Sequence, residues 1–251
     1  MRRLDRGIAE LLTALDALVG PTGYAVMLTA DHGSNPLPEV SRAGLGAWCR
    51  RGPNAARTDY WQRQCGRGVR LGSADIARQL DEAHTVIAGV VDPFVYLTDK
   101  GKALGADDRA ALQRKIVSLF AGSGDVAAVI DVRNAPETCP PPSDESIPAL
   151  TCRSIRRDQA ADFYLVPAPG TFFDPELAAG RGTNHGSPYL YDRAVPLIVR
   201  APGRVPAGAT RITPTSFAAF ARTASSLLAI PEPPGLAGSD APDLTAAAAR
   251  Q

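Results

Sequence analysis

Helical and extended apolar patterns follow one another from the start of the chain. Apolar side chains recur every three or four positions between residues 3 and 19, which predicts an amphipathic helix. Gly20 and Pro21 then end this pattern in the way that helices usually end. Residues 24–30 form an apolar run that predicts a buried strand. A helix that leads into a buried strand is typical of α/β proteins.

The same two patterns continue along the rest of the chain. We expect strands at residues 86–91, 94–97, 126–132, 161–166 and 195–199, and helices at residues 73–80, 107–121 and 215–228. Ser73 and Asp107 or Asp108 stand where helix N-caps are expected. We therefore predict an α/β fold with a mostly parallel sheet flanked by helices and interrupted by irregular insertions.

A chain of 251 residues can bury a large core, and we expect one domain over residues 1–251. Residues 34–72 are rich in Gly, Pro and Arg, and residues 134–158 contain a Cys-Pro-Pro-Pro run, so we interpret both as surface insertions. The Pro- and Ala-rich residues 231–251 are predicted to form a disordered tail.

Net charge and the length of apolar runs argue against nucleic acid as a partner and against a membrane span. The formal net charge of +1 gives no electrostatic case for binding nucleic acid. No apolar run approaches the roughly 20 residues that a membrane span requires. No apolar segment follows the charged N-terminal residues, so a signal peptide is not predicted there.

Four cysteines form two local pairs, Cys49 with Cys65 and Cys139 with Cys152. Neither pair has the spacing of a zinc knuckle. Two short-range disulfides, which would indicate an oxidising compartment, and four free thiols are both compatible with this spacing.

The candidate chemistry begins where the first predicted strand ends. Asp31 and His32 follow the run at residues 24–30, and the carboxyl ends of strands are where open α/β sheets place their ligands. A carboxylate and an imidazole are zinc ligands, and Gly33 would permit a tight turn that presents both to one ion. A hydrogen-bonded structural role for His32 is the alternative.

His185 stands between Gly182 and Gly186, ahead of Ser187-Pro188. Such a glycine-flanked loop is costly unless its backbone must approach something closely. We therefore interpret His185 as a third metal ligand, against the alternative of an ordinary exposed histidine. His84 has no acidic neighbour on its apolar side and is interpreted as structural.

These two motifs carry a resemblance to a known family. Thr29-Ala30-Asp31-His32-Gly33, followed by residues 182–189 (GTNHGSPY), Tyr191-Asp192 and residues 195–198 (VPLI), resembles the alkaline phosphatase superfamily. The most similar branch is the type I phosphodiesterase/nucleotide pyrophosphatase-like group with its phosphate-irrepressible alkaline phosphatases. The resemblance implies a partial alkaline-phosphatase-like sandwich and a hydrolase of phosphate mono- or diesters that uses two zinc ions. One zinc would be held partly by Asp31 and His32, and the other by His185.

The first motifs of the family have no counterpart here. Its aspartate ligand, its threonine or serine nucleophile and its Asp-x-x-x-His motif all precede the Asp-His pair, and no such motif occurs before Asp31. The resemblance therefore implies the C-terminal half of such an enzyme, with no catalytic nucleophile among these residues. The missing half would come from a longer protein or from a partner chain.

Three alternatives stay open. The chain could be a catalytically inactive remnant that serves as a binding or structural domain, a sulfatase-like hydrolase fragment, or a domain in which Asp31, His32 and His185 share one zinc ion. A signal-bearing N-terminal half would imply a periplasmic or extracellular protein, and its absence a cytoplasmic one.

Overall fold

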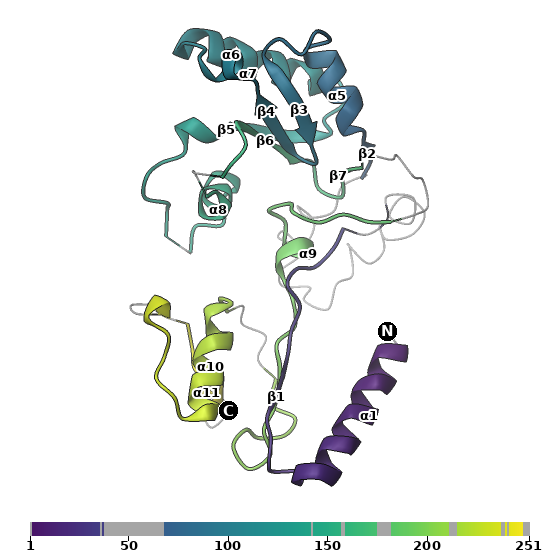
Figure 1. The fold of residues 1–251 in the computed structure, drawn as a ribbon, viewed down its shortest axis with the longest axis vertical. Coiled ribbons are helices and arrows are strands. Elements are labelled where there is room, and N and C mark those ends of the chain that lie inside the picture. Colours follow the sequence, from purple (N-terminus) through teal and green to yellow (C-terminus); the bar gives the residue numbers. More distant parts are fainter. Residues whose placement is uncertain are drawn as a thin grey trace, which may run out of the picture. The chain divides into compact units, whose positions relative to one another are not determined.

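The computed structural model describes residues 2–35, 37, 68–141, 143–156, 159–174, 182–210, 215–236, 239 and 241–247 (Figure 1). Most of the predicted insertion at residues 34–72, with Cys49 and Cys65, lies outside these ranges. The chain divides into two compact units: Met1–Asp31 with Val195–Gln251, and His32–Ala194. A single domain over residues 1–251 stays a prediction.

The larger unit, His32–Ala194, contains a four-stranded sheet with helices on one face (Figure 1). In spatial order the strands are β3 (Ile87–Val91), β4 (Phe94–Leu97), β6 (Phe163–Pro167) and β5 (Val126–Asp131). The helices that pack beside them are α5 (Ser73–Leu80), α6 (Asp99–Lys102) and α7 (Ala106–Phe120). A short parallel pair, β2 (Arg70–Leu71) and β7 (Phe172–Phe173), completes the unit's strands within the described residues.

The α/β class is confirmed, but the strands of the main sheet run antiparallel where we expect a mostly parallel sheet. The chain itself gives the reason for one pairing. Only Asp92 and Pro93 separate β3 from β4, and a two-residue link can join only antiparallel neighbours. Asp92 has a φ of 50°, a left-handed conformation that suits such a tight hairpin turn.

Side-chain alternation in β6 divides the sheet into two faces. Phe163 and Leu165 enter the core between the sheet and the helices α5 and α7. Tyr164 points to the opposite face, where its ring stacks on Phe94 with centroids 5.4 Å apart. Burying each large apolar core residue stabilises the fold by about 1.5–3 kcal/mol. The core includes Ile76, Leu80, Ile87, Val95, Ile116 and Phe120.

A buried ion pair joins α7 to the sheet. Arg109 donates through Nε and Nη2 to the two carboxylate oxygens of Asp131, each at 2.7 Å, and Nη2 also donates to the Asp162 carbonyl at 3.1 Å. The guanidinium lies 4.7 Å from the centre of the Phe163 ring. Its hydrogen bonds to Asp131 raise the pKa of Arg109. The charge is therefore fully paired within the interior.

The predicted surface insertion at residues 134–158 contains a short helix that sequence patterns did not reveal, α8 (Ile147–Ser154). The Ser146 side chain caps it by accepting from Ala149 N. Cys139 and Cys152 form a disulfide with Cα atoms 5.6 Å apart. Of the two alternatives for this pair, the disulfide is the one found. Closing a loop of this length stabilises by about 3 kcal/mol in the chain-entropy account.

The smaller unit begins with the predicted amphipathic helix, α1 (Arg2–Val19). Its two-stranded sheet pairs β1 (Val26–Leu28) with β8 (Ile198–Arg200), and its C-terminal part contains α10 (Ala218–Leu228), η4 (Pro234–Leu236) and α11 (Leu244–Ala247). β1 is shorter than the predicted strand at residues 24–30. The Tyr24 ring, just before it, lies 4.8 Å from the guanidinium carbon of Arg200. Among the described helices, none has both the length and the apolarity to cross a bilayer.

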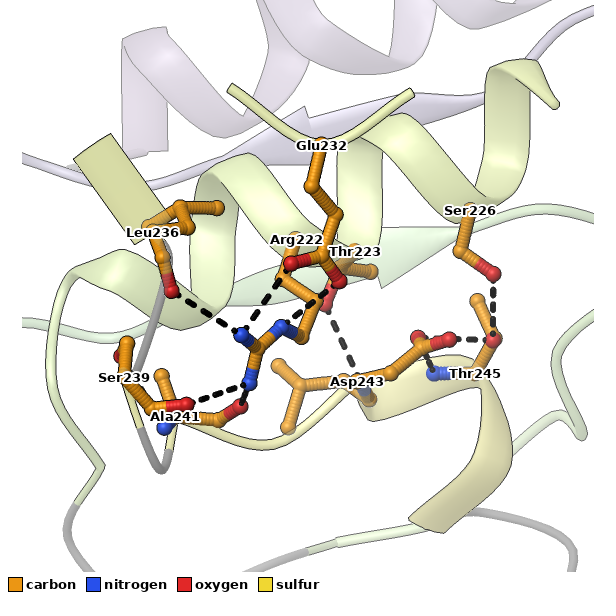
Figure 2. A network of polar contacts seen from close by, with 10 residues as sticks. Arg222, Thr223, Ser226, Glu232, Leu236, Ser239, Ala241, Asp243 and Thr245 are labelled. Atoms are coloured by element: carbon orange, nitrogen blue, oxygen red, sulfur yellow. Dashed lines mark hydrogen bonds and ion pairs between the residues drawn. The ribbon is translucent and has the colours of Figure 1, made fainter. Parts of the chain in front are cut away.

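Arg222 of α10 organises the described part of residues 231–251, for which we expect disorder (Figure 2). Its guanidinium pairs with both carboxylate oxygens of Glu232, at 2.8 and 3.1 Å, and donates to the backbone carbonyls of Leu236, Ser239 and Ala241. Leu244 N donates to the Thr223 hydroxyl at 3.1 Å. These bonds hold the start of α11 against α10.

The buried Arg109–Asp131 ion pair is expected to stabilise the fold. Replacing Arg109 by Met leaves the Asp131 carboxylate buried without its cation, which costs about 3–5 kcal/mol. We expect this loss in the free energy of unfolding measured with urea. Arg78→Ala, which removes an exposed pair with Asp75, is the control and changes it by less than about 1 kcal/mol. Equal effects of the two substitutions would contradict the assigned role of Arg109.

Candidate metal centre

Two of the three histidines, far apart in the sequence, lie side by side in the larger unit. The imidazole rings of His32 and His185 stack with centroids 3.5 Å apart and planes inclined by 16°. Both residues are exposed. Asp31 is the last residue of the first segment of the other unit, and its part in the centre stays a prediction.

The segment that follows His32 runs along the histidine loop, defined as residues 182–193. Gly33 N donates to the Asp192 carbonyl at 2.8 Å, and Asn35 N donates to the Asn184 carbonyl at 3.1 Å. The Thr183 hydroxyl donates to the Asn35 carbonyl. These three bonds join two stretches of chain that are 148 residues apart at this last contact, and so bring the two imidazoles together.

Glycines serve two different purposes here. A side chain at Gly33 would collide with the Tyr191 carbonyl oxygen, so Gly33 is needed for close approach of the histidine loop rather than for the tight turn we expect. Gly182 and Gly186 have φ values of 61° and 98° and open space where a side chain would stand. They are needed for backbone conformation, not for the close approach that the sequence suggests.

Asn184 fixes the backbone immediately before His185. Its side-chain amide donates to Asp92 Oδ1 at 3.0 Å and to the Phe173 carbonyl at 2.9 Å, while its Oδ1 accepts from His185 N at 2.9 Å. The side chain therefore ties the loop to the β3–β4 turn and to β7 at once. His185 starts from a fixed point on the sheet.

Asp192, in the short helix α9 (Leu190–Arg193), closes the loop behind His185. Its Oδ2 accepts from Ser187 N at 2.9 Å and from Ser187 Oγ at 2.5 Å. Burial raises the pKa of Asp192, while the two hydrogen bonds from Ser187 and the nearby His185 and His32 act in the opposite direction. A small cavity, with room for about one water molecule, is lined by Asp192, Ser187 and His185.

Three tyrosines, of which Tyr164 and Tyr189 are buried and Tyr191 is partly buried, hold the loop against β6 and the turn that follows it. Tyr164 donates to the Gly186 carbonyl at 3.0 Å, Tyr189 donates to the Pro167 carbonyl at 2.8 Å, and Tyr191 accepts from Gly170 N at 2.9 Å. Burial raises the pKa of Tyr191 to about 12, and it raises the pKa values of Tyr164 and Tyr189 as well. All three phenols stay protonated at neutral and mildly alkaline pH.

The donor chemistry of the two imidazoles suits a metal ion. His32 Nδ1 lies 2.6 Å from the Gly33 carbonyl oxygen, which can only accept, so Nδ1 is the donor in this hydrogen bond. Exposed imidazole nitrogens are common zinc ligands. Within the described ranges no group of three His, Cys, Asp or Glu side chains is arranged to hold an ion.

Sequence reasoning missed the supporting residues. Asn184, Ser187 and Asp192 appear in the recognised motif, but their hydrogen bonds could not be anticipated from spacing. The sequence held one indication for Asp192. It is a single carboxylate between the apolar residues 189–191 and an apolar strand, and a buried carboxylate needs hydrogen-bond donors.

Gly33 gives a test of the loop arrangement. Gly33→Ala would force the histidine loop away from the 33–35 segment, and such overpacking costs about 1–3 kcal/mol of unfolding free energy. Gly89→Ala in β3 is the matched control, since a side chain there meets open space without a left-handed φ. Urea unfolding that shows no difference between these two variants would contradict the close approach at Gly33.

The raised pKa values of these three tyrosines predict a loss of stability at alkaline pH. An unfolded tyrosine loses its proton near pH 10, whereas the folded phenols do so at higher pH, to about 12 for Tyr191. Their stabilisation is therefore complete below pH 10 and is lost as the pH rises through the folded pKa values. Between pH 8 and 11 we expect a loss of up to about 1.4 kcal/mol per tyrosine in urea unfolding. Tyr191→Phe should make this loss smaller, and an unchanged pH dependence would contradict the assignment.

No protein-family model matches the chain. It is 27% identical over 243 residues to a protein of Myroides odoratus named calcium-transporting ATPase, a match that covers 94% of this chain and 39% of that protein. It is 26% identical over 207 residues to the alkaline phosphatase PhoK of Sphingomonas sp, covering 78% of this chain and 33% of PhoK. The chain thus spans between a third and two fifths of the length of these relatives.

The solved structures to which the chain is similar are also alkaline phosphatases. Wild-type alkaline phosphatase PafA superposes with a TM-score of 0.63 at 22% identity, over 93% of this chain and 40% of PafA. A multiply substituted PafA variant superposes with a TM-score of 0.62 at 21% identity. The resemblance to the alkaline phosphatase superfamily is therefore confirmed, and the chain has the fold of part of such a protein.

Proposed function

We propose that the chain is the C-terminal part of a zinc-dependent hydrolase of phosphate mono- or diesters, in which Asp31, His32 and His185 are metal ligands. The observation that carries the proposal is the stacking of His32 on His185 with centroids 3.5 Å apart. Paired metal ions in phosphoryl-transfer sites lie about 3.5–4 Å apart, so imidazoles this close together can serve neighbouring ions. The alkaline-phosphatase-like fold supports the same reaction class.

When bound, the two ions would activate an oxygen nucleophile and offset negative charge on the phosphoryl oxygens. The chain's own residues hold the ligands for this task. The Gly33 carbonyl orients the His32 ring through Nδ1, and Asn184 fixes the backbone from which His185 projects. Under this proposal the nucleophile and the remaining ligands belong to the part of the relatives that the chain does not match.

Two other functions fit the same fold. A catalytically inactive remnant would keep the loop and sheet contacts as a binding or structural domain, without a need for exposed imidazole nitrogens. A sulfatase-like hydrolase would share the architecture with a different ester. The side-by-side exposed imidazoles favour a metal-dependent hydrolase over the remnant.

Zinc binding tests the proposal. We expect the metal-free chain to bind Zn²⁺ weakly in isothermal titration calorimetry, and His185→Ala to weaken this binding further because it removes the ligand of one of the two ions. His84→Asn is the matched control and leaves binding unchanged, since His84 lies in a turn with a φ of 49° that asparagine tolerates. We expect no turnover of p-nitrophenyl phosphate or bis-p-nitrophenyl phosphate by this chain alone.

Zinc binding that is equal in His185→Ala and in the unsubstituted chain would contradict the assigned ligands. Turnover by the chain alone that is lost in His185→Ala would instead show that the nucleophile lies within these residues. A chain that binds no Zn²⁺ at all would favour the inactive remnant.

A further inference from the structure

We infer that Asp192 is a positioning residue for His185: its second carboxylate oxygen, Oδ1, accepts the imidazole N–H of His185, directly or through one water molecule. The other ring nitrogen of His185 is then left with its lone pair toward the open side. The metal-binding consequence rests on the proposed function, whereas the hydrogen bond itself does not.

Other atoms of Asp192 already accept hydrogen bonds from the segments that carry the two imidazoles. Its backbone carbonyl accepts from Gly33 N at 2.8 Å, directly after His32. Its Oδ2 accepts both donors of Ser187, two residues after His185. The carboxylate is therefore held in one orientation, which fixes the direction in which Oδ1 points.

Oδ1 is the atom that needs a partner. It is buried and has no hydrogen-bond partner in the described structure, and Asp192 as a whole is only 5% exposed. A buried carboxylate oxygen without a donor is destabilising, because it has lost its hydrogen bonds to water and gained none in return. Ser187 cannot supply the donor, because its N–H and hydroxyl are both directed to Oδ2.

His185 offers the complementary group. Within the described contacts its ring takes part in stacking on His32, and its hydrogen bond to Asn184 uses the backbone N–H rather than the ring. His185 and Asp192 line the same small cavity, which has room for about one water molecule. The unpaired Asp192 Oδ1 and the His185 ring N–H at the same cavity can therefore satisfy each other's hydrogen bonding.

With this hydrogen bond, each of the two imidazole rings donates one N–H to a protein acceptor. The His32 ring already donates Nδ1–H to the Gly33 carbonyl. With Asp192 as its acceptor, the His185 ring has one nitrogen anchored by the protein, and its other nitrogen faces the open side. Carboxylates and carbonyls that accept the second N–H of a ligating histidine fix its tautomer, and losing them typically weakens metal binding 10- to 100-fold.

The substitution Asp192→Asn reverses the hydrogen-bond direction with little change of shape. The amide oxygen has to take the place of Oδ2, because both Ser187 groups donate there. The amide NH₂ then occupies the place of Oδ1 and can only donate. The His185 ring must present a lone pair to it, so its proton moves to the other nitrogen.

Imidazole ¹⁵N–¹H correlation spectra of the metal-free, ¹⁵N-labelled chain at pH 8 test this directly. The chain has only three histidines, so His185→Gln assigns the His185 signals. We expect one dominant tautomer for His185 in the unsubstituted chain and the opposite tautomer in Asp192→Asn. The matched control is Asp131→Asn, which changes a buried carboxylate paired with Arg109 and leaves the His185 tautomer unaltered.

The same tautomer in Asp192→Asn and in the unsubstituted chain would overturn the inference. If Asp192→Asn does not fold, the unsubstituted chain still decides, because a mixture of tautomers typical of a solvated imidazole would also overturn it. Zn²⁺ titration then separates the two proposals: we expect at least tenfold weaker binding in Asp192→Asn. A tautomer switch in a chain that never binds Zn²⁺ would support the hydrogen bond and contradict the metal-dependent hydrolase.

Discussion

The pairing of residues 33–35 with the histidine loop is the interaction on which the candidate centre depends. Three hydrogen bonds, from Gly33 N, Asn35 N and the Thr183 hydroxyl, join segments that lie far apart in the sequence. The pairing is possible only because position 33 carries no side chain against the Tyr191 carbonyl. Without it, His32 and His185 would be two unrelated loop histidines.

The rest of the larger unit gives this pairing a rigid base. Alternation along β6 sends Phe163 and Leu165 into the core and Tyr164 toward the loop, so one strand serves both stability and the site. Asn184 adds a second attachment, to the β3–β4 turn and to β7. The Arg109–Asp131 pair fixes α7 on the far side of the sheet.

The sequence predicted most elements, because the apolar period separates helices from strands over long stretches, as in α1 and α7. It did not predict strand direction, because apolar runs look alike in parallel and antiparallel sheets. The two-residue Asp92-Pro93 link, which requires antiparallel neighbours, was not used. The convergence of His32 and His185 followed from the recognised motif rather than from spacing. The roles of Asn184, Ser187 and Asp192 depend on contacts across the loop, which no local pattern encodes.

The central claim is that His32 and His185 form one metal-binding surface. The most direct measurement is anomalous diffraction at the zinc edge from crystals of the chain grown with Zn²⁺. We predict zinc about 2.0–2.1 Å from an imidazole nitrogen of His32 or His185, with the two rings still adjacent. Zinc bound elsewhere, or His32 and His185 separated beyond the reach of neighbouring ions, would contradict the account.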